Sequence, residues 1–332
     1  MKIAIVILNW NGRALLEQFL PSITTYSKGA VLYVADNAST DDSIAFLEAE
    51  YPTIKIITNT TNGGYAKGYN DALSQIDTDI FCLLNSDVAV TENWLQPIHD
   101  VFEQQSNVAA IQPKILDYKR PEYFEYAGAA GGYIDQFGYP YCRGRIFDSI
   151  EKDLSQYNDT TPIFWASGAC LFIRKQVFDI VGQFDEDYFA HQEEIDLCWR
   201  IHNHGYQILY MGSSTVFHVG GATLNAASPQ KTFLNFRNSL FNLIKNVPGY
   251  HVPYIIFCRM LLDGVAGIKF LTEGKTLHFF AILKAHGFFY LKFLKFLKKR
   301  SKSSKPSKKS NYFQRKSILW DYFILKNQIF QK

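Results

Sequence analysis

The chain has 332 residues, of which 47% are hydrophobic and 20% are charged. This length and hydrophobic content allow one large α/β domain with an appendage, and they exclude an unfolded chain. The formal net charge is only +3, but basic residues crowd 292–316 and acidic residues concentrate before residue 196, so the two halves are expected to face different partners.

Cysteine usage and the N-terminal stretch bear on the compartment. The five cysteines are odd in number and form no CxxC pair, which argues against a disulfide framework and a structural zinc site and fits a reducing compartment. The N-terminus has one lysine and a six-residue apolar run, 3–8, before the polar Asn9. This pattern lacks the features of a signal peptide, so we expect a cytoplasmic protein.

Four apolar runs in the first hundred residues predict strands, at 3–8, 31–35, 54–57 and 80–84. Runs of this kind are buried in parallel sheets. A helix is expected at about 13–22, and a second from a cap at Ser39 or Thr40 to about residue 50. Repeated β-α units predict a doubly wound sheet whose ligand lies beyond the carboxyl edge, where the polar turns should converge.

A nicotinamide-binding dehydrogenase is the obvious competitor for this pattern. Its phosphate-binding fingerprint needs three spaced glycines after the first strand, whereas only Gly12 stands there, so we reject it. Gly63, Gly64 and Gly68 do lie at the third strand-to-helix turn. Glycines there either let the backbone approach a phosphate or sugar closely, or serve only a tight turn.

An acidic stretch carries the strongest functional signal. Six carboxylates lie between Asp185 and Asp196, in a segment rich in aromatic and aliphatic residues. The apolar pattern after residue 193 predicts a helix packed on the core, with Glu193 and Glu194 in its first turn, where the helix dipole favours an anion. A general base can be held there; the alternative is that the acids only cap and solvate the helix start.

Five motifs in order, at 6–12, 36–41, 62–70, 83–88 and 184–200, resemble those of family-2 glycosyltransferases, in particular the rhamnosyltransferase-like branch that builds bacterial surface polysaccharides. The resemblance covers about residues 3–238. It implies the GT-A fold, a Rossmann-like, doubly wound mixed sheet. The activity it implies is inverting transfer of a sugar from a nucleoside-diphosphate sugar to a hydroxyl of a growing, lipid-linked glycan.

The resemblance assigns the donor site to the strand ends and glycine turns. Asn9, Asn11 and Asp36 would hold the base and ribose, and Asp and Asn side chains suit the ring N–H of uracil or thymine. For Asp36 and Asp41, a capping role before the next helix is the alternative. The remaining residues expected to bind the nucleotide sugar are Asn37, Gly64, Lys67, Asn85, Ser86 and Gly168.

The resemblance also implies a divalent metal, Mg²⁺ or Mn²⁺. The family's DxD motif corresponds here to Asn85-Ser86-Asp87, so its first carboxylate is replaced by Asn. One Asp suffices if phosphates supply further oxygen ligands, although this change puts a strict metal requirement in doubt. His218 matches the family's late histidine beside Gly220 and Gly221, where it would complete the metal site; a core or loop histidine is the alternative.

Three acids are candidates for the catalytic base. The pair at Glu193 and Glu194 matches the family's Glu-Asp motif, whose second member is the base, so Glu194 is the first choice. Glu193 and Asp185 are the alternatives, and Asp196 is a further candidate for fixing the helix. The competing class is a catalytically silent relative that binds a nucleotide sugar or scaffolds an assembly, against which the presence of both Asp87 and the acidic pair argues.

Two further segments are less regular. Residues 118–159 are rich in Tyr, Gly and Arg without a clear period; such loops suit acceptor binding by Arg143 and Arg145, or are an ordinary surface excursion. Residues 165–174 predict a strand with small residues near the donor sugar.

The C-terminal third changes character. We place the catalytic domain at 1–232, a helical membrane-associating appendage outside the catalytic core at 233–300, and a basic linker with an amphipathic tail at 301–332. Charges interrupt each apolar run before the ~18 residues that a spanning helix needs. Lysines 292, 295, 298 and 299 alternate with Phe and Leu, which predicts a basic amphipathic helix on the anionic inner face of the membrane rather than a nucleic-acid contact.

Overall fold

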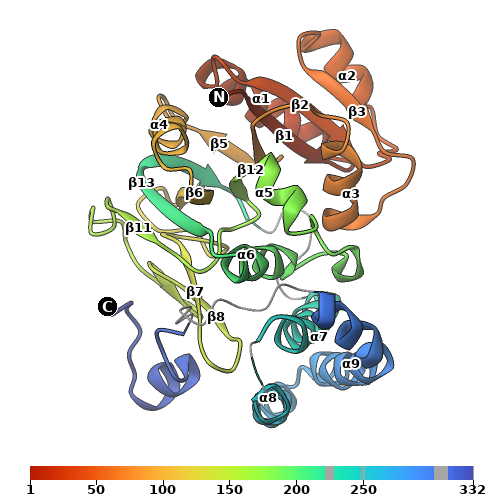
Figure 1. Cartoon of the computed structure of the whole chain (residues 1–332), viewed down its shortest axis with the longest axis vertical. Helices are drawn as coiled ribbons and strands as arrows, with labels where there is room; N and C mark the ends of the chain where they lie inside the picture. Colours follow the sequence, from red (N-terminus) through yellow and green to blue (C-terminus); the bar gives the residue numbers. More distant parts are fainter. Residues whose placement is uncertain (221–227, 248, 250, 303–312, 332) are drawn as a thin grey trace.

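The computed structural model describes residues 1–220, 228–247, 249, 251–302 and 313–331. Gly221, part of the expected histidine motif, and most of the basic linker lie outside the described residues. Figure 1 shows an α/β body, in the upper part of the view, above a layer of C-terminal helices.

The main sheet is mixed. Its central strands β1 (Ile3–Asn9), β2 (Val31–Asp36), β3 (Lys55–Thr58) and β4 (Ile80–Asn85) pair in parallel in the order β4-β1-β2-β3. β12 (Cys170–Arg174) joins β4 antiparallel, and β6 (Val108–Asp117), β13 (Gln207–His218) and β11 (Thr160–Pro162) follow, with β5 (Val88–Val90) on β13. The predicted doubly wound α/β sheet is confirmed.

Alternate residues of β1 enter two different cores, because successive side chains of a strand point to opposite faces. Ile3, Ile5 and Ile7 pack on one face with α1 (Arg13–Tyr26), α2 (Ser43–Glu50) and α4 (Gln96–Gln104). Ala4 and Val6 pack on the other with α3 (Gly64–Leu73), α5 (Lys175–Ile180) and α6 (Glu193–Asn203). The acidic helix therefore lies on the same face as the glycine turn.

Two local expectations need correction. The second helix starts at Ser43 and neither Ser39 nor Thr40 caps it; Ser39 Oγ accepts a hydrogen bond from Asn11 N at 2.9 Å instead. The strand expected at 165–174 begins only at Cys170, because side chains take up the preceding amides, as when Ser167 N donates to Gln112 Oε1 at 2.8 Å.

The irregular segment 118–159 contains a second, four-stranded antiparallel sheet. Its strands are β7 (Gly132–Ile134), β8 (Pro140–Cys142), β9 (Arg145–Ile146) and β10 (Ser149–Ile150). Arg143 and Arg145 are both buried: Arg143 forms an ion pair with Asp159, and Arg145 Nε donates to the carbonyl of Tyr126 at 3.0 Å. These contacts favour a structural role for both side chains over acceptor binding.

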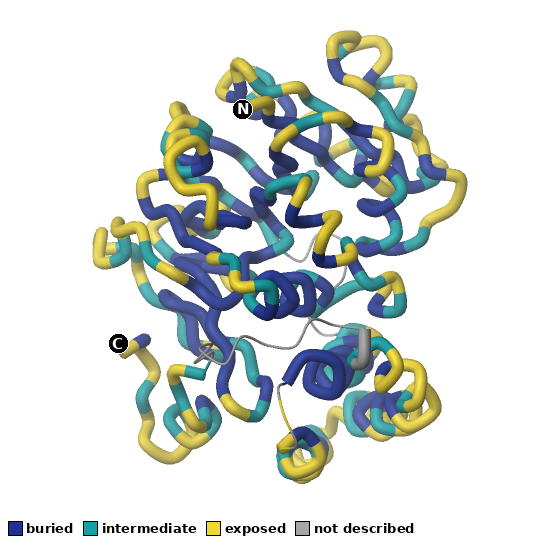
Figure 2. The backbone as a smooth tube through the Cα atoms, in the orientation of Figure 1, coloured by how far each residue is buried: buried dark blue, intermediate teal, exposed yellow. Residues whose placement is uncertain are grey.

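The C-terminal region forms three helices, α7 (Pro229–Asn246), α8 (Val252–Thr272) and α9 (Thr276–Lys302), and a π-helical turn, η2 (Trp320–Ile324). α7 is largely buried between the body and α9, where Phe241 stacks on Phe296, whereas α8 and α9 expose one side (Figure 2). The tail returns to the four-stranded sheet, with Ile318 N donating to Asp135 at 2.9 Å. No helix within the described residues is long and apolar enough to cross a bilayer.

Candidate active site

The ends of three parallel strands meet at one edge of the sheet. Asn9 pairs in register with Asp36 on β2, and its neighbour Leu8 pairs with Asn85 on β4. Asn9 Nδ2 donates to Asp36 Oδ1 at 3.1 Å, and both side chains are buried. The buried Asn9 Oδ1 has no hydrogen-bond partner within the described part of the chain, so this edge retains an acceptor for a ligand donor.

The two neighbouring turns are built by asparagines. Asn11 Oδ1 accepts from Thr40 N at 2.7 Å, which ties the first turn to the second. Asn37 Nδ2 donates to Asn62 Oδ1 at 2.9 Å, and Asn37 itself lies against the backbone of Gly68, where a β-carbon would crowd its amide. Asn11 and Asn37 therefore shape this edge of the sheet through contacts within the protein.

Lys67 and Ser86 lie differently. Lys67 Nζ forms an ion pair with Asp71 at 2.8 Å one turn along α3, and its side chain is 41% exposed. Ser86 Oγ lies near the position that a β-carbon on Gly12 would occupy, so it borders the first turn. Donor binding by either residue stays a prediction.

Asp87 and His218 form the charged centre of this edge. His218 Nε2 lies 3.0 Å from Asp87 Oδ1, and its Nδ1 lies 3.4 Å from Glu125 Oε2. Asn85 Nδ2 is 3.4 Å from the same Nε2. Burial opposes the imidazolium, but hydrogen bonds to Asp87 and Glu125 outweigh it and raise the pKa of His218 to about 10.

The donor set at this centre fits a divalent ion that takes most of its ligands from elsewhere. Among the described residues no group of three or more His, Cys, Asp or Glu side chains is placed to hold a metal. Asp87 Oδ1 and His218 Nε2 lie 3.0 Å apart, so this pair could offer a carboxylate oxygen and, once the ring loses its proton, an imidazole nitrogen to the ion. Glu125 would then orient His218 through Nδ1, as carboxylates behind metal-bound histidines do.

The acidic pair stands at the start of α6, as expected. Glu193 is buried, and its Oε2 has no hydrogen-bond partner in the described structure, while Glu194 keeps part of its surface exposed. Burial raises the pKa of Glu194 to about 7, and burial together with the charge of Glu194 raises that of Glu193 well above its usual range. With a pKa near 7, Glu194 is suited to act as a base near neutral pH.

Tyr65 links the glycine turn to the strand ends. Burial raises the pKa of Tyr65 well above its usual range, and the charges of Tyr69, Glu193 and Glu194 add to this rise. Its hydroxyl donates to the carbonyl of Gly168 at 2.8 Å, and a β-carbon on Gly168 would crowd that hydroxyl. The neighbouring Ala169 carbonyl accepts from Asn85 N at 3.0 Å, so Tyr65 is connected through Gly168 and Ala169 to the strand end that carries Asn85.

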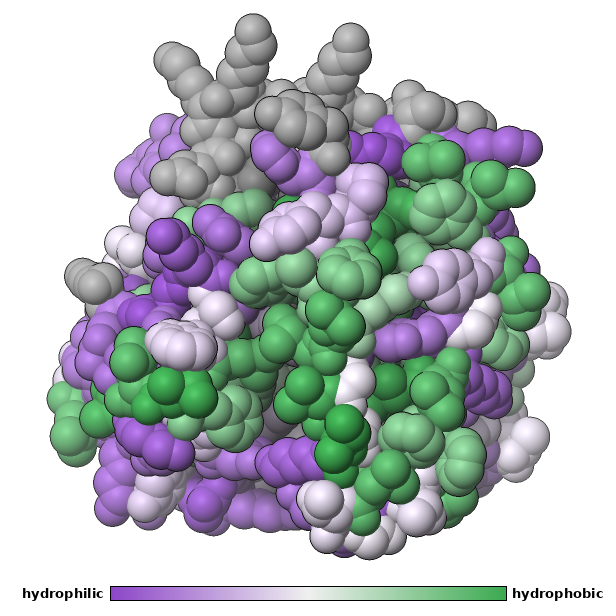
Figure 3. Space-filling view, turned by 90° about the horizontal axis from the view of Figure 1, so that it is seen from below, coloured by the Kyte–Doolittle hydropathy of each residue, from purple (hydrophilic) through white to green (hydrophobic). Residues whose placement is uncertain are grey.

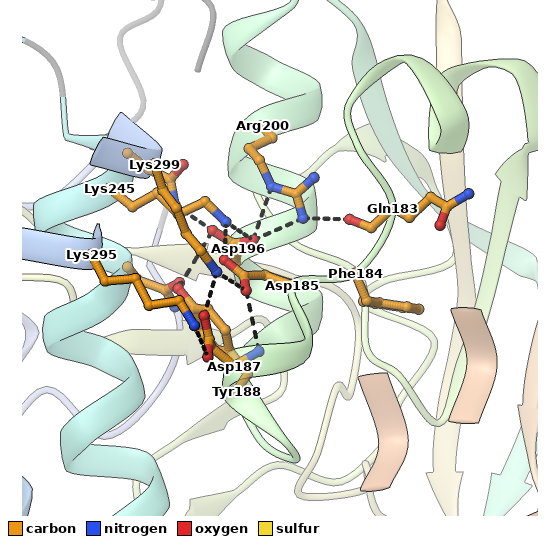
Figure 4. Close-up of polar contacts among 12 residues, drawn as sticks. Gln183, Phe184, Asp185, Asp187, Tyr188, Asp196, Arg200, Lys245, Lys295 and Lys299 are labelled. Carbon is orange, nitrogen blue, oxygen red and sulfur yellow. Dashed lines mark hydrogen bonds and ion pairs between the residues drawn. The ribbon is translucent and has the colours of Figure 1, made fainter. Parts of the chain in front are cut away.

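Asp185 and Asp196 are engaged elsewhere. Lys245 Nζ lies 2.8 Å from a carboxylate oxygen of each, and Asp196 also pairs with Arg200 (Figure 4). Despite its burial, the adjacent Arg200 and Lys245 hold the pKa of Asp196 well below its usual range. Asp185 pairs in addition with Lys299. The base role of Asp185 stays untested, but its contacts favour a structural one.

Sequence reasoning missed Glu125 and Lys245 as parts of this region. Glu125 lies in the aperiodic segment 118–159, where a lone carboxylate gives no pattern to follow. Lys245 comes from α7, beyond the segment assigned to chemistry. Tyr65 lay inside a quoted motif, and its aromatic ring beside two glycines was the one available signal.

A mixed doubly wound sheet with an Asp–His pair at its carboxyl edge, and an acidic pair at the start of a helix that packs on it, fits a glycosyltransferase of the GT-A class. Over residues 1–233 the chain matches the family described as Glycosyltransferase like family 2, and it belongs to that family. It is therefore a glycosyltransferase enzyme.

Relatives and solved structures agree with this class. The chain is 27% identical over 222 residues, 61% of this chain and 71% of the relative, to an N-acetylglucosaminyl-diphospho-decaprenol L-rhamnosyltransferase of Mycobacterium tuberculosis. It is 24% identical to a low-salt glycan biosynthesis hexosyltransferase of Haloferax volcanii, covering 60% of this chain and 61% of that one.

Among solved structures, a mannosyltransferase from Pyrobaculum calidifontis in complex with GDP-Man and Mn²⁺ aligns with TM-score 0.54 at 13% identity, covering 88% of this chain and 87% of that one. GalNAc-T7 with UDP, GalNAc and Mn²⁺ aligns with TM-score 0.57 at 14% identity over 74% of this chain, which spans 48% of that structure. These similarities show the fold.

Proposed function

We propose that the chain is an inverting glycosyltransferase that moves a sugar from a nucleoside-diphosphate sugar to a hydroxyl of a lipid-linked glycan. The observation that carries the proposal is the geometry of two charged groups: Glu193 and Glu194 in the first turn of α6, and Asp87 with His218 at the end of the sheet strands. Burial raises the pKa of Glu194 to about 7. A base with that pKa can accept a hydroxyl proton near neutral pH.

The reaction is a single displacement at the anomeric carbon. The acceptor oxygen forms the new bond as the bond to the diphosphate breaks, Glu194 takes the hydroxyl proton, and the nucleoside diphosphate leaves. Asn9 and Asp36 hold the base and ribose. Asp87 and His218 would hold Mg²⁺ or Mn²⁺, which supplies positive charge against the departing diphosphate. The competing function, a silent nucleotide-sugar-binding relative, lacks a need for this base.

The similarity to the mycobacterial N-acetylglucosaminyl-diphospho-decaprenol L-rhamnosyltransferase supports a lipid-linked acceptor. The exposed face of the C-terminal helices supports a location at the membrane. On α8, residues at helical spacing are 58% to 66% exposed; they are Tyr254, Phe257, Leu261, Val265 and Ile268. α9 and the tail add exposed Leu291, Leu294 and Trp320. We call these eight residues the apolar face.

Figure 3 views the molecule from the end that carries α8 and α9 and shows hydrophobic side chains gathered across it, with hydrophilic ones around them. The exposed lysines 269, 284 and 292 lie on the same two helices, and the exposed Lys275 lies in the connection between them. We propose that this face docks onto an anionic bilayer, inserting its apolar side chains at the headgroup boundary. The enzyme would then work on the inner face of the cell membrane, without nucleic acid as a partner.

The structure corrects one part of the expected basic face. Lys295 and Lys299 turn toward the body and pair with aspartates there, Lys295 with Asp187 at 2.6 Å. Each lysine near an anionic surface contributes about 1 kcal/mol to the free energy of membrane binding. Because Lys295 and Lys299 pair with aspartates instead, a larger share of that free energy must come from insertion of the apolar side chains. The end of the catalytic domain at residue 232 stays a prediction. Helix α7, which follows this position, is largely buried against the body.

Sedimentation with liposomes tests the docking. Leu291→Gln and Leu154→Gln remove equally exposed leucines, each 78% exposed, from α9 and from the body, respectively. We expect Leu291→Gln to weaken sedimentation with anionic vesicles, and Leu154→Gln to leave it unchanged. Equal sedimentation of both variants and the native chain would place the membrane contact elsewhere.

Release of nucleoside diphosphate tests the transferase function. The native chain is incubated with uridine, thymidine and guanosine diphosphate sugars, with Mn²⁺ or with chelator. We expect metal-dependent release from one of them, absent in Glu194→Gln. Tight binding of a nucleotide sugar without any release, with acceptor lipids present, would favour the silent relative.

A further inference from the structure

The loop that precedes the acidic pair, residues 185–192, is gripped by α7. We call it the base loop. Asn238 Nδ2 donates to three of its carbonyls, those of Tyr188 at 3.1 Å, Ala190 at 3.0 Å and His191 at 2.7 Å. Asn238 is fully buried. One amide group, whose two N–H bonds are shared among three acceptors, thus ties three backbone carbonyls of the loop to α7, where Arg237 also donates to the Tyr188 carbonyl at 2.9 Å.

The base loop has a backbone that needs such support. Phe189, His191 and Gln192 all have positive φ, at 66°, 66° and 73°. Non-glycine residues there cost about 1 kcal/mol or more each and persist where the surroundings hold them. Gln192 is the residue directly before Glu193, so the geometry of the loop sets the direction in which α6 and its first-turn carboxylates start.

Lysines from α7 and α9 hold the other end of the base loop. Lys245 bridges Asp185 and Asp196, and Lys299 bridges Asp185 and Asp187 (Figure 4). Asp185 is buried and Asp187 partly exposed. Removing one partner of a buried pair leaves an uncompensated charge, so these lysines tie the loop firmly to the C-terminal helices.

The far side of the base loop touches the donor turn. The Phe189 carbonyl accepts from Tyr65 N at 2.8 Å, and its ring lies where a β-carbon on Gly64 would project. The loop is therefore held between the residues expected to contact the donor and the helices expected to contact the membrane.

We propose that Asn238 and Lys299 are positioning residues: through the base loop, α7 and α9 hold Glu194 in the orientation that proton transfer requires. The proposal rests on Glu194 as the base of the proposed function. Under this proposal, the helices after residue 232 influence the turnover rate. They would then do more than dock the protein to a membrane, which was the role expected from the sequence. A shift of about 1 Å at a reacting group can lower the rate by about 10²-fold.

Asn238→Asp tests it with little change of shape. The substitution replaces the donating amide by a carboxylate that faces three carbonyls. We expect kcat to fall by about tenfold or more with the donor KM within about threefold, because donor contacts lie on other elements. Asn235→Asp, three residues earlier on α7 and partly exposed, is the matched control and should keep the native kcat.

Two readouts separate positioning from a loss of folded protein. The titratable groups near Glu194 are Glu193, Tyr65 and Cys198. A loosened loop admits water to Glu194, and this weakens the burial that raises its pKa. The acid limb of the kcat–pH profile should therefore move to lower pH. Hydrogen exchange at residues 187–192 and at Tyr65 should quicken in Asn238→Asp but not in Asn235→Asp. The exchange measurement needs no activity, so it tests the loop even if no donor is turned over.

A second pair of variants addresses the lysine contacts. Lys299→Arg keeps the charge beside Asp185 and Asp187 and should keep most of kcat, whereas Lys299→Met should lower it. Absence of donor turnover in the native chain would overturn the proposed function alone. Unchanged exchange of the base loop in Asn238→Asp, or native kcat and acid limb in both Asn238→Asp and Lys299→Met, would overturn the positioning role.

Discussion

Glu194→Gln separates catalysis from stability. The variant keeps the shape of the side chain and removes its ability to take a proton. Loss of a positioned general base lowers turnover by about 10² or more, while nucleotide binding, which we assign to Asn9 and Asp36, should be retained. In the native chain kcat should fall below about pH 7 as Glu194 protonates, since burial raises its pKa to that value.

At alkaline pH, Glu194→Gln should be more stable toward unfolding than the native chain. The folded pKa of Glu194 lies above its ordinary value of 4.5, so the folded state holds the proton more tightly than the unfolded state, and stability declines as pH rises from about 4.5 to 7. The full shift corresponds to at most about 3 kcal/mol, less for partial exposure and for coupling to Glu193.

Thermal unfolding at pH 5 and pH 8, together with donor turnover, measures both effects. We expect Glu194→Gln to raise Tm at pH 8 by several degrees relative to the native chain, with a much smaller difference at pH 5. Glu48→Gln, on the exposed face of α2, is the control and should change neither quantity. Near-native turnover in Glu194→Gln, or a lower Tm at pH 8, would refute the assignment and direct attention to Glu193.

Three further outcomes are expected. Glu125→Gln should weaken Mn²⁺-dependent nucleotide binding by about 10–100-fold, as losses behind a metal-bound histidine do; unchanged affinity in titration calorimetry would contradict it. Gly64→Ala should lower the free energy of unfolding in urea by at least about 1 kcal/mol, because φ is +77° and a β-carbon would meet Phe189; native stability would show that this contact yields. Vesicle sedimentation should weaken with salt, but residual binding at 1 M salt should persist through apolar insertion; complete release would show that charge alone holds it.

The placement of Asn9, Asp36 and Asn85 at one edge of the sheet was predictable because it follows from local pattern. Buried β-branched runs with polar ends specify parallel strands, and the carboxyl ends of parallel neighbours share one edge. The helix that begins at Glu193 was predictable for the same reason, since its apolar spacing extends over several turns. Where periodicity was strong, element boundaries agreed within a few residues.

The partners of the charged residues were not predictable from pattern. Lys295 and Lys299 read as a basic surface stripe, yet they pair with Asp185 and Asp187, more than a hundred residues earlier in the chain. Such pairings depend on how α9 packs on α7, through contacts such as Phe241 on Phe296. The high density of carboxylates after Asp185 did indicate a functional region. The pattern could not show that Asp185, Asp187 and Asp196 pair with lysines, whereas Glu193 and Glu194 pair with none that the structure describes.

Titration calorimetry of the native chain with nucleoside diphosphates tests the central claim most directly. UDP, dTDP and GDP are titrated in the presence of Mn²⁺ and again with chelator, into the native chain and into Asp87→Ala. The account predicts that at least one nucleotide binds with Mn²⁺, that chelator weakens that binding, and that Asp87→Ala removes the difference between the two conditions. Equal affinity with and without the metal in the native chain, or an undiminished metal effect in Asp87→Ala, would contradict it.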